Sequence, residues 1–181
     1  MAKFYDELNE GLINFIKKQK IFFTATSAQE GRINLSPKGM DTFRCLNNKN
    51  VAYLNLTGSA NETAAHVLAD GRMTIMLCSF DTAPLILRLY GKARTVHQYD
   101  KEWEKYFSYF MDIPGKRQIV VLDIESVQIS CGYSIPFYEF KGDRNQLIEW
   151  AEKKGEQGVR KYWEENNQIS IDGLETKILG V

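Results

Sequence analysis

Residues 85–94 read LILRLYGKAR, and this stretch decides the fold class of the 181-residue chain. Apolar or small residues occupy every second position, and most of the positions between them are cationic. Because side chains alternate between the two faces of a β-strand, one face would pack in a core and the other would carry Arg88, Lys92 and Arg94. Arg88 lies deepest among the leucines, so a specific anionic partner is expected for it rather than for Lys92 or Arg94, which fit a solvated face.

Five further segments with strand-like composition surround this one, at residues 21–26, 32–36, 51–56, 73–80 and 118–129. Helical spacing of apolar residues predicts helices over 4–20, from about Ser59 to Gly71, over 100–110, and from Leu147 onward with a weak middle at Gly155. The tail, residues 169–181, reads as extended. Six strands joined by short connections predict a mainly β, α+β fold: a six-stranded antiparallel split β-barrel with flanking helices.

Composition excludes several functional classes. The chain carries 23 basic and 23 acidic residues, which argues against a nucleic-acid-binding surface. No apolar run approaches the roughly 18 residues of a membrane span, and the first residues lack the apolar region of a signal peptide. Three scattered cysteines and two histidines give no disulfide framework and no zinc motif. We therefore expect a cytoplasmic, metal-free domain without nucleic-acid or membrane partners.

Residues 56–63 (LTGSANET) leave a strand and enter a helix, and they form the first candidate site. Ser59 and Glu62 have the spacing of a capping box, so the helix is expected to begin close to Ser59. Free backbone N–H groups at a helix start, together with hydroxyl groups, can bind a phosphate. The alternative is a capped turn without a ligand, because serine and threonine cap helices routinely. The candidate phosphate-binding residues are Thr57, Gly58, Ser59, Asn61, Glu62 and Thr63.

Residues 34–39 (NLSPKG) form the second candidate site. Strand alternation would place Asn34, Ser36 and Lys38 on one face, with Pro37 ending the strand. An amide, a hydroxyl and a cation together suit an anion or a polar heterocycle. A solvated edge strand that ends in a proline turn is the alternative.

Taken in order, residues 34–39, 56–66 and 88–93 resemble the pyridoxamine 5′-phosphate oxidase-like family of FMN-binding split barrels. The resemblance covers roughly residues 20–130 and implies a homodimer with FMN at the subunit interface and a small-molecule substrate or electron donor. It implies that Asn34, Ser36, Pro37 and Lys38 lie along the flavin, that the turn at 57–63 meets its phosphate, and that Arg88 faces the cofactor. No catalytic residue is assigned.

The oxidase itself carries an Arg-Lys pair in the phosphate-binding turn, and the matching positions here are Glu62 and Thr63. The resemblance therefore implies a subgroup of the family rather than the oxidase proper: an FMN-dependent oxidoreductase of unidentified substrate. A non-catalytic flavin- or haem-binding sensor or storage protein is the alternative. Residues 1–130 would form the FMN-binding split barrel, and residues 131–181 a helical extension packed on it. Residues 32–94 hold eight basic and four acidic residues, so the proposed cofactor-binding segment carries a net charge of +4.

Overall fold

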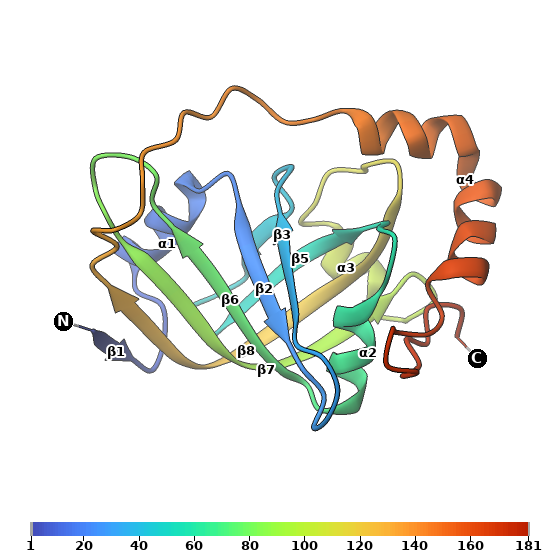
Figure 1. The fold of residues 1–181 in the computed structure, drawn as a ribbon, viewed down its shortest axis with the longest axis horizontal. Helices are drawn as coiled ribbons and strands as arrows, with labels where there is room; N and C mark the ends of the chain where they lie inside the picture. Colours follow the sequence, from blue (N-terminus) through green and yellow to red (C-terminus); the bar gives the residue numbers. More distant parts are fainter. Residues whose placement is uncertain (1, 181) are drawn as a thin grey trace.

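The computed structural model describes residues 2–180 as one antiparallel sheet of eight strands, curled into a half-open barrel (Figure 1). The strand order is β3-β2-β6-β7-β8-β5-β4, and β1 pairs with β8 outside this path. Strands β3 and β4 are the two edges, and they do not pair with each other. The predicted split barrel is therefore confirmed, with two short strands added to the six that were expected.

The long strands β7 (Ile86–His97) and β8 (Lys116–Ser130) form the centre of the sheet. Leu87, Leu89 and Ala93 of β7 are buried in the main hydrophobic core, as the alternation in LILRLYGKAR predicts. Gly91 lies at a register shift between the two strands, and a Cβ there would collide with the backbone oxygen of Asp123 at 1.9 Å. Glycine is therefore required at this position, because only it lets the two backbones approach so closely.

Strands β2 (Phe22–Thr26), β3 (Asn34–Lys38) and β6 (Arg72–Cys78) form one flank of the sheet. The prediction that the strand before Pro37 stops at that residue is wrong, because β3 continues through Pro37 to Lys38. Strand β3 pairs only with β2, so the missing N–H of proline removes no hydrogen bond from the interior of the sheet.

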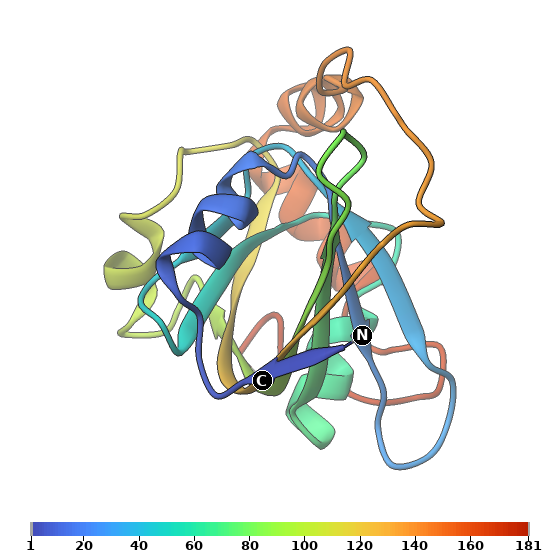
Figure 2. The ribbon, with the colours of Figure 1, turned by 90° about the vertical axis from the view of Figure 1, so that its left-hand side faces the viewer.

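The other flank contains β5 (Asn50–Leu56) and the short edge strand β4 (Phe43–Cys45). Strand β1 (Lys3–Tyr5) adds to the end of β8. The predicted N-terminal helix therefore begins later than expected: Phe4 is in β1, and α1 spans Glu10–Lys18 with Asn9 as its N-cap. Figure 2 shows α1 lying against the curled sheet. Its buried residues Leu12 and Ile16 extend the core.

Two short helices follow strands of the barrel. Helix α2 (Glu62–Ala69) begins three residues after the expected capping residue Ser59, with Asn61 at the N-cap position. It ends before Gly71, whose φ of 81° is left-handed, as expected of a glycine that terminates a helix. Helix α3 (Trp103–Phe107) buries Trp103 against the second core cluster.

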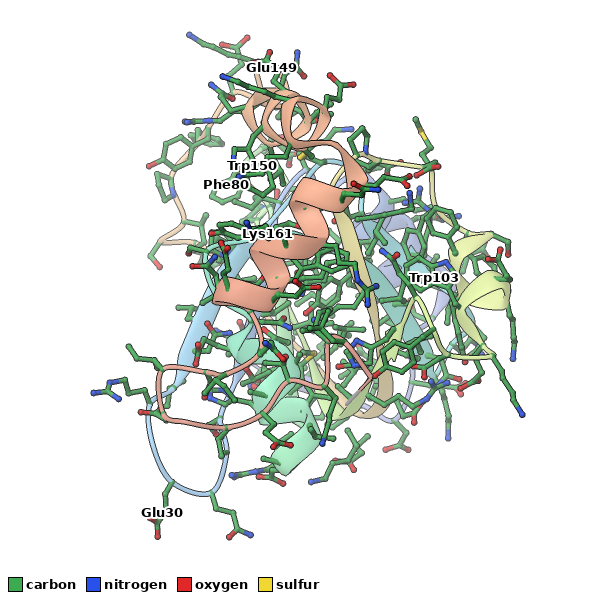
Figure 3. The ribbon with its side chains drawn as sticks, turned by 90° about the vertical axis from the view of Figure 1, so that its right-hand side faces the viewer. Glu30, Phe80, Trp103, Glu149, Trp150 and Lys161 are labelled. Carbon is green, nitrogen blue, oxygen red and sulfur yellow. The ribbon has the colours of Figure 1, made fainter. Side chains whose placement is uncertain are left out.

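Beyond β8 the chain crosses above the barrel and enters α4 (Gln146–Asn166), which has two limbs. Gly155, with φ 65° and ψ 169°, breaks the helix where the sequence predicts a weak middle. Figure 3 shows the first limb, near Glu149, nearly end-on, and the second limb, which carries Lys161, running down the same side of the molecule. The tail after α4 forms turns and one isolated bridge rather than an extended strand.

Among residues 2–180, none of the helices is both long and apolar enough to cross a membrane. The same part of the chain contains no cluster of three or more His, Cys, Asp or Glu side chains that could hold a metal ion.

Candidate functional site

A cavity of about 450 Å³ opens between the two edges of the sheet. One wall is β3, and the opposite wall is the end of β5 with the turn that leads into α2. Its volume is within the range of small-molecule sites. The lining includes every predicted cofactor-binding residue except Arg88: Asn34, Ser36, Pro37, Lys38, Thr57, Gly58, Ser59, Asn61, Glu62 and Thr63.

The turn between β5 and α2 is held by side chains from distant parts of the chain. The Thr57 hydroxyl donates to the Gly115 carbonyl (2.9 Å) and accepts a hydrogen bond from the Trp163 indole N–H (2.9 Å). Asn167 donates from its amide nitrogen to the Gly58 carbonyl (3.2 Å). Because these bonds use the Thr57 side chain, its role at the site is to fix the turn.

Gly58 lies in this turn, but its backbone does not require glycine. Its φ is not positive, and a Cβ at this position would meet no closer atom than the Ala60 carbonyl oxygen, at 3.7 Å. The left-handed residues near the cavity are instead Met40 and Asp41, with φ of 62° and 53°, in the turn that follows β3. Met40 lines the cavity.

The N-terminus of α2 points its positive end toward the cavity. Asn61 occupies the N-cap position but makes no capping hydrogen bond, because its side chain exchanges two hydrogen bonds with Gln118 (2.8 and 3.3 Å). The Glu62 carboxylate accepts a hydrogen bond from the Ile171 N–H (3.0 Å) in the tail. The first-turn N–H groups of α2 thus receive no acceptor from the N-cap side chain, which leaves this end of the helix suited to an anion.

The inward face of β3 carries a connected polar network. Ser36 donates to the Asn34 side-chain oxygen (3.1 Å), and the Asn34 amide donates to Thr63 (3.1 Å) and Thr26 (3.4 Å). Thr26 in turn contacts His66 (3.2 Å), which is buried in α2. The network joins β3 to the start of α2, so the two candidate segments form one rigid wall.

Two cations define the electrostatics of the cavity. Burial, and then the charge of Arg117, lower the pKa of Lys38 from 10.5 to about 8. Arg117 is 3% exposed, and burial lowers its pKa from 12.5 to about 10. Within residues 2–180 neither cation forms an ion pair with a carboxylate. Half-buried Lys38 and buried Arg117 outnumber the carboxylate of Glu62 in the lining, so the cavity carries a net positive charge that suits an anion.

Arg117 donates to the Ala60 carbonyl (3.0 Å) and to the Asn167 side-chain oxygen (2.7 Å), whereas its Nε has no partner. The sequence reasoning missed this residue, because one arginine at the start of a strand carries no local signal. In the pairing of β5 with β8, Asn55 lies opposite Gln118 and Leu56 lies opposite Lys116. Arg117, between these two pairs, has no partner on β5 and forms a bulge that faces the turn.

Arg88 does not line the cavity within one chain. It lies between the buried residues Leu87 and Leu89, so its side chain is on the opposite face of the sheet from the core. There it donates to the Ser130 hydroxyl (3.3 Å). The predicted contact between Arg88 and a cofactor stays a prediction.

The cavity therefore combines two cations outside any ion pair, helix-terminal N–H groups and the hydroxyl of Ser59, a donor set that suits a phosphate ester. Comparison with known proteins agrees with the resemblance of the sequence motifs. The family described as pyridoxamine 5′-phosphate oxidase matches residues 8–131. The pyridoxamine 5′-phosphate oxidase family protein ustO of Aspergillus flavus is 34% identical over 192 residues, which cover 96% of this chain and 77% of ustO.

Solved structures share the fold. A candidate pyridoxamine 5′-phosphate oxidase from Lactobacillus delbrueckii superposes with a TM-score of 0.55 at 19% identity, over 68% of this chain and 94% of its own. A pyridoxamine 5′-phosphate oxidase-related, FMN-binding protein from Nostoc punctiforme gives a TM-score of 0.50 at 14% identity, over 66% and 82% of the two chains. The extent of the family match and the identity to ustO show that this chain belongs to the pyridoxamine 5′-phosphate oxidase family.

Proposed function

We propose that the protein binds FMN, with the phosphate group in the cavity between β3 and the start of α2. The observation that carries this proposal is the pair of cations, Lys38 and Arg117, that line the cavity without a carboxylate partner. A terminal phosphate carries a charge of about −1.5 to −2 at neutral pH, which matches two cations. The FMN-binding description of the Nostoc punctiforme protein, which has the same fold, supports the choice of flavin.

FMN is favoured over FAD because of this charge. FMN ends in a phosphate monoester that concentrates up to two negative charges on one group, whereas the diphosphate of FAD is an anhydride with one charge on each phosphate and continues into an adenosine. Lys38 and Arg117 would neutralise the monoester, and the first-turn N–H groups of α2 would donate to its oxygens. Asn34 and Ser36 on β3 would contact the polar part of the cofactor.

Bound FMN would supply the electron-transfer chemistry, and the protein would act as an oxidoreductase on a small molecule. The chain's own contribution is to hold the phosphate in a buried site and to keep the β3 wall fixed through the network of Asn34, Ser36 and Thr63. Arg117 takes the place of the basic residues that the oxidase carries in the turn, where this chain has Glu62 and Thr63.

The test compares FMN with riboflavin, which lacks only the phosphate. Lys38→Met should weaken FMN binding about tenfold or more and change riboflavin binding less than about twofold, because one charge-assisted contact to the phosphate is lost. Lys101→Met is the matched control, since Lys101 is exposed and does not line the cavity. Fluorescence titration measures the affinity, and the melting temperature of each variant checks that it folds.

Equal losses of affinity for FMN and for riboflavin in the Lys38→Met variant would show that Lys38 does not contact the phosphate. A wild-type protein that neither binds FMN nor melts at a higher temperature in its presence would refute the proposal as a whole. Mixing the FMN-loaded protein anaerobically with reduced nicotinamides, and then with oxygen, tests turnover. A flavin that is neither reduced nor reoxidised would favour a binding or storage role instead.

A further inference from the structure

A second, larger cavity of about 1010 Å³ adjoins the first. The two share the lining residues Pro37, Lys38, Gly39, Met40 and Leu147, so a ligand in one lies next to a ligand in the other. Its outer wall comes from residues 138–147, the stretch that leads from the crossing segment into α4. These residues lie outside the family match, which ends at residue 131. The alignment to ustO extends over nearly the whole chain, so this wall lies beyond the family model but within the similarity to that relative.

Aromatic side chains form one side of this cavity. The Tyr138 N–H donates to the Phe80 carbonyl (3.2 Å), and the two rings meet edge to face with centroids 5.4 Å apart. Phe140 lines the same cavity. Tyr138 and Phe140 are 70% and 51% exposed, although they are anchored beside a cavity. Exposed aromatic rings grouped around a hollow are typical of a surface that a planar apolar ligand covers.

Three lysines also line this cavity. Lys18 and Lys20 come from the end of α1 and the residues after it, and Lys38 comes from β3. None of the three is in an ion pair within residues 2–180. The Lys20 ammonium lies 5.6 Å from the centre of the Phe140 ring, so a cation and an aromatic surface stand side by side.

The acidic residues of the cavity offset part of this charge: hydrogen bonds from Ala83 and Ser79, and then the charge of Lys18, lower the pKa of the Asp81 carboxyl. The Asp81 carboxylate accepts hydrogen bonds from the Ser79 hydroxyl (2.8 Å) and the Ala83 N–H (3.1 Å). Glu139 and Asp143 belong to the aromatic side, where Arg144 accompanies them. Lys20 and Lys38 therefore remain available to an anionic group, and Lys18 does so in part.

We propose that this second cavity binds a small planar aromatic molecule that carries an anionic group, such as a carboxylate. The ring packs against Phe80, Tyr138 and Phe140, and the anionic group faces Lys18 and Lys20. This inference rests on the proposed function in one respect: beside a bound flavin, such a molecule would be its reaction partner. Binding of the molecule itself requires only the cavity.

The experiment uses 2-naphthoate and 2-naphthamide, which share a ring system and differ in charge. Calorimetric titration of the full chain, with and without FMN, should show that naphthoate binds and naphthamide binds more weakly. Lys18→Ala combined with Lys20→Ala should weaken naphthoate binding about fivefold or more and leave naphthamide unchanged, because only naphthoate uses the charge. Phe140→Ser should weaken both ligands by a similar factor, since both use the ring.

Matched controls are Lys101→Ala for the lysines and Tyr133→Ser for the aromatic residue. Tyr133 is 82% exposed and does not line the cavity. Control variants that lose as much affinity as the test variants would overturn the inference, and so would wild-type protein that binds neither probe. If the cavity face is instead covered by a second copy of the chain, Phe140→Ser converts a dimer to a monomer and naphthoate does not bind, which also overturns it.

Absorbance of bound FMN is recorded separately in every sample. Loss of FMN binding with intact, lysine-dependent naphthoate binding would refute the proposed function and support the aromatic-anion cavity. Intact FMN binding without lysine-dependent naphthoate binding would refute the proposed aromatic-anion site and support the proposed function.

Discussion

Lys38 and Arg117 have an unusual environment for cations, since burial lowers the pKa of both and neither forms an ion pair with a carboxylate among residues 2–180. In many buried sites an opposite charge offsets the free energy of desolvation. Here the offset comes only from backbone and amide oxygens, which Arg117 contacts at Ala60 and Asn167. An anionic ligand would supply the missing charge, so the state of Lys38 should control the affinity of that ligand.

The pKa of Lys38, lowered from 10.5 to about 8, predicts a pH dependence of FMN binding. Only the protonated amine attracts the phosphate, so the dissociation constant should rise above pH 8, by at most about tenfold per pH unit for one linked proton. Lys38→Arg keeps its charge and should give a flat profile between about pH 7 and 9. Fluorescence titration with riboflavin as the control measures this. A wild-type profile as flat as that of Lys38→Arg would contradict the assignment.

The same shift predicts the opposite trend for the stability of the FMN-free protein. The folded pKa of about 8 lies below the value of 10.5 for a solvated lysine, so between these values the unfolded chain binds more protons than the native one. The free energy of unfolding contributed by Lys38 should therefore increase as pH rises through this window.

At the scale of elements, the second limb of α4 and the tail hold the turn that forms the cavity. Trp163 donates a hydrogen bond to Thr57, and the Ile171 N–H donates one to Glu62. Asn167 donates a hydrogen bond to the Gly58 carbonyl and accepts one from Arg117. The break at Gly155 separates this limb from the first, which leads from the aromatic wall of the second cavity. Leu147 of the first limb lines both cavities, whereas the second limb acts on the first cavity only by bracing its turn through Trp163.

Trp163→Phe tests this bracing role. The variant removes the indole N–H that donates to Thr57 and part of a buried ring, and it should lower the free energy of unfolding by about 2 kcal/mol. FMN affinity should fall severalfold because the turn is no longer fixed. Trp150→Phe is the control, since Trp150 is half-buried and its indole N–H makes no hydrogen bond within residues 2–180. Denaturant titration and FMN binding measure both effects, and identical results for the two variants would contradict the role.

At the scale of the whole molecule, the open edge of the sheet at β3 is relevant to whether two copies of the chain associate. Ile33 and Leu35 are 78% and 66% exposed at the start of this edge strand, which pairs on one side only. Unpaired strands with exposed apolar side chains are usually covered by another surface. Together with the outward position of Arg88 on the same sheet, this supports our proposal of a homodimer with the cofactor near the subunit interface.

Leu35→Glu should therefore shift the protein from dimer to monomer in sedimentation equilibrium, because a buried unpaired charge at an interface is unfavourable. Met111→Glu is the control: Met111 is 70% exposed but belongs to the loop after α3, away from β3. A wild-type protein that is monomeric at all concentrations, or a Leu35→Glu variant that remains as dimeric as the control, would contradict the proposal.

Local patterns in the sequence predict the strands, the break at Gly155 and most of the cavity lining. Alternation in LILRLYGKAR reflects burial of one face, which depends on neighbouring residues of one strand. Likewise, Asn34, Ser36 and Lys38 share a face because they alternate along β3, and the turn at 57–63 is signalled by its own residues. The helix expected to begin close to Ser59 begins at Glu62, and the predicted strand end at Pro37 is wrong, because β3 is an edge strand that tolerates proline. Asn61 pairs with Gln118, and β3 needs no hydrogen bond on its open side.

The sequence by itself thus determined the strand pattern and the family, and it predicts the segment where an anion would bind, because each depends on residues close together in the chain. Only the tertiary structure decided which cation joins Lys38 and what fixes the turn. Arg117 reaches Ala60 across a separation of 57 residues, and Trp163 reaches Thr57 across 106. The second cavity is likewise assembled from α1, β3 and residues 138–147. No local pattern encodes such contacts, since they exist only once the sheet has curled and the C-terminal segment has packed on its open side.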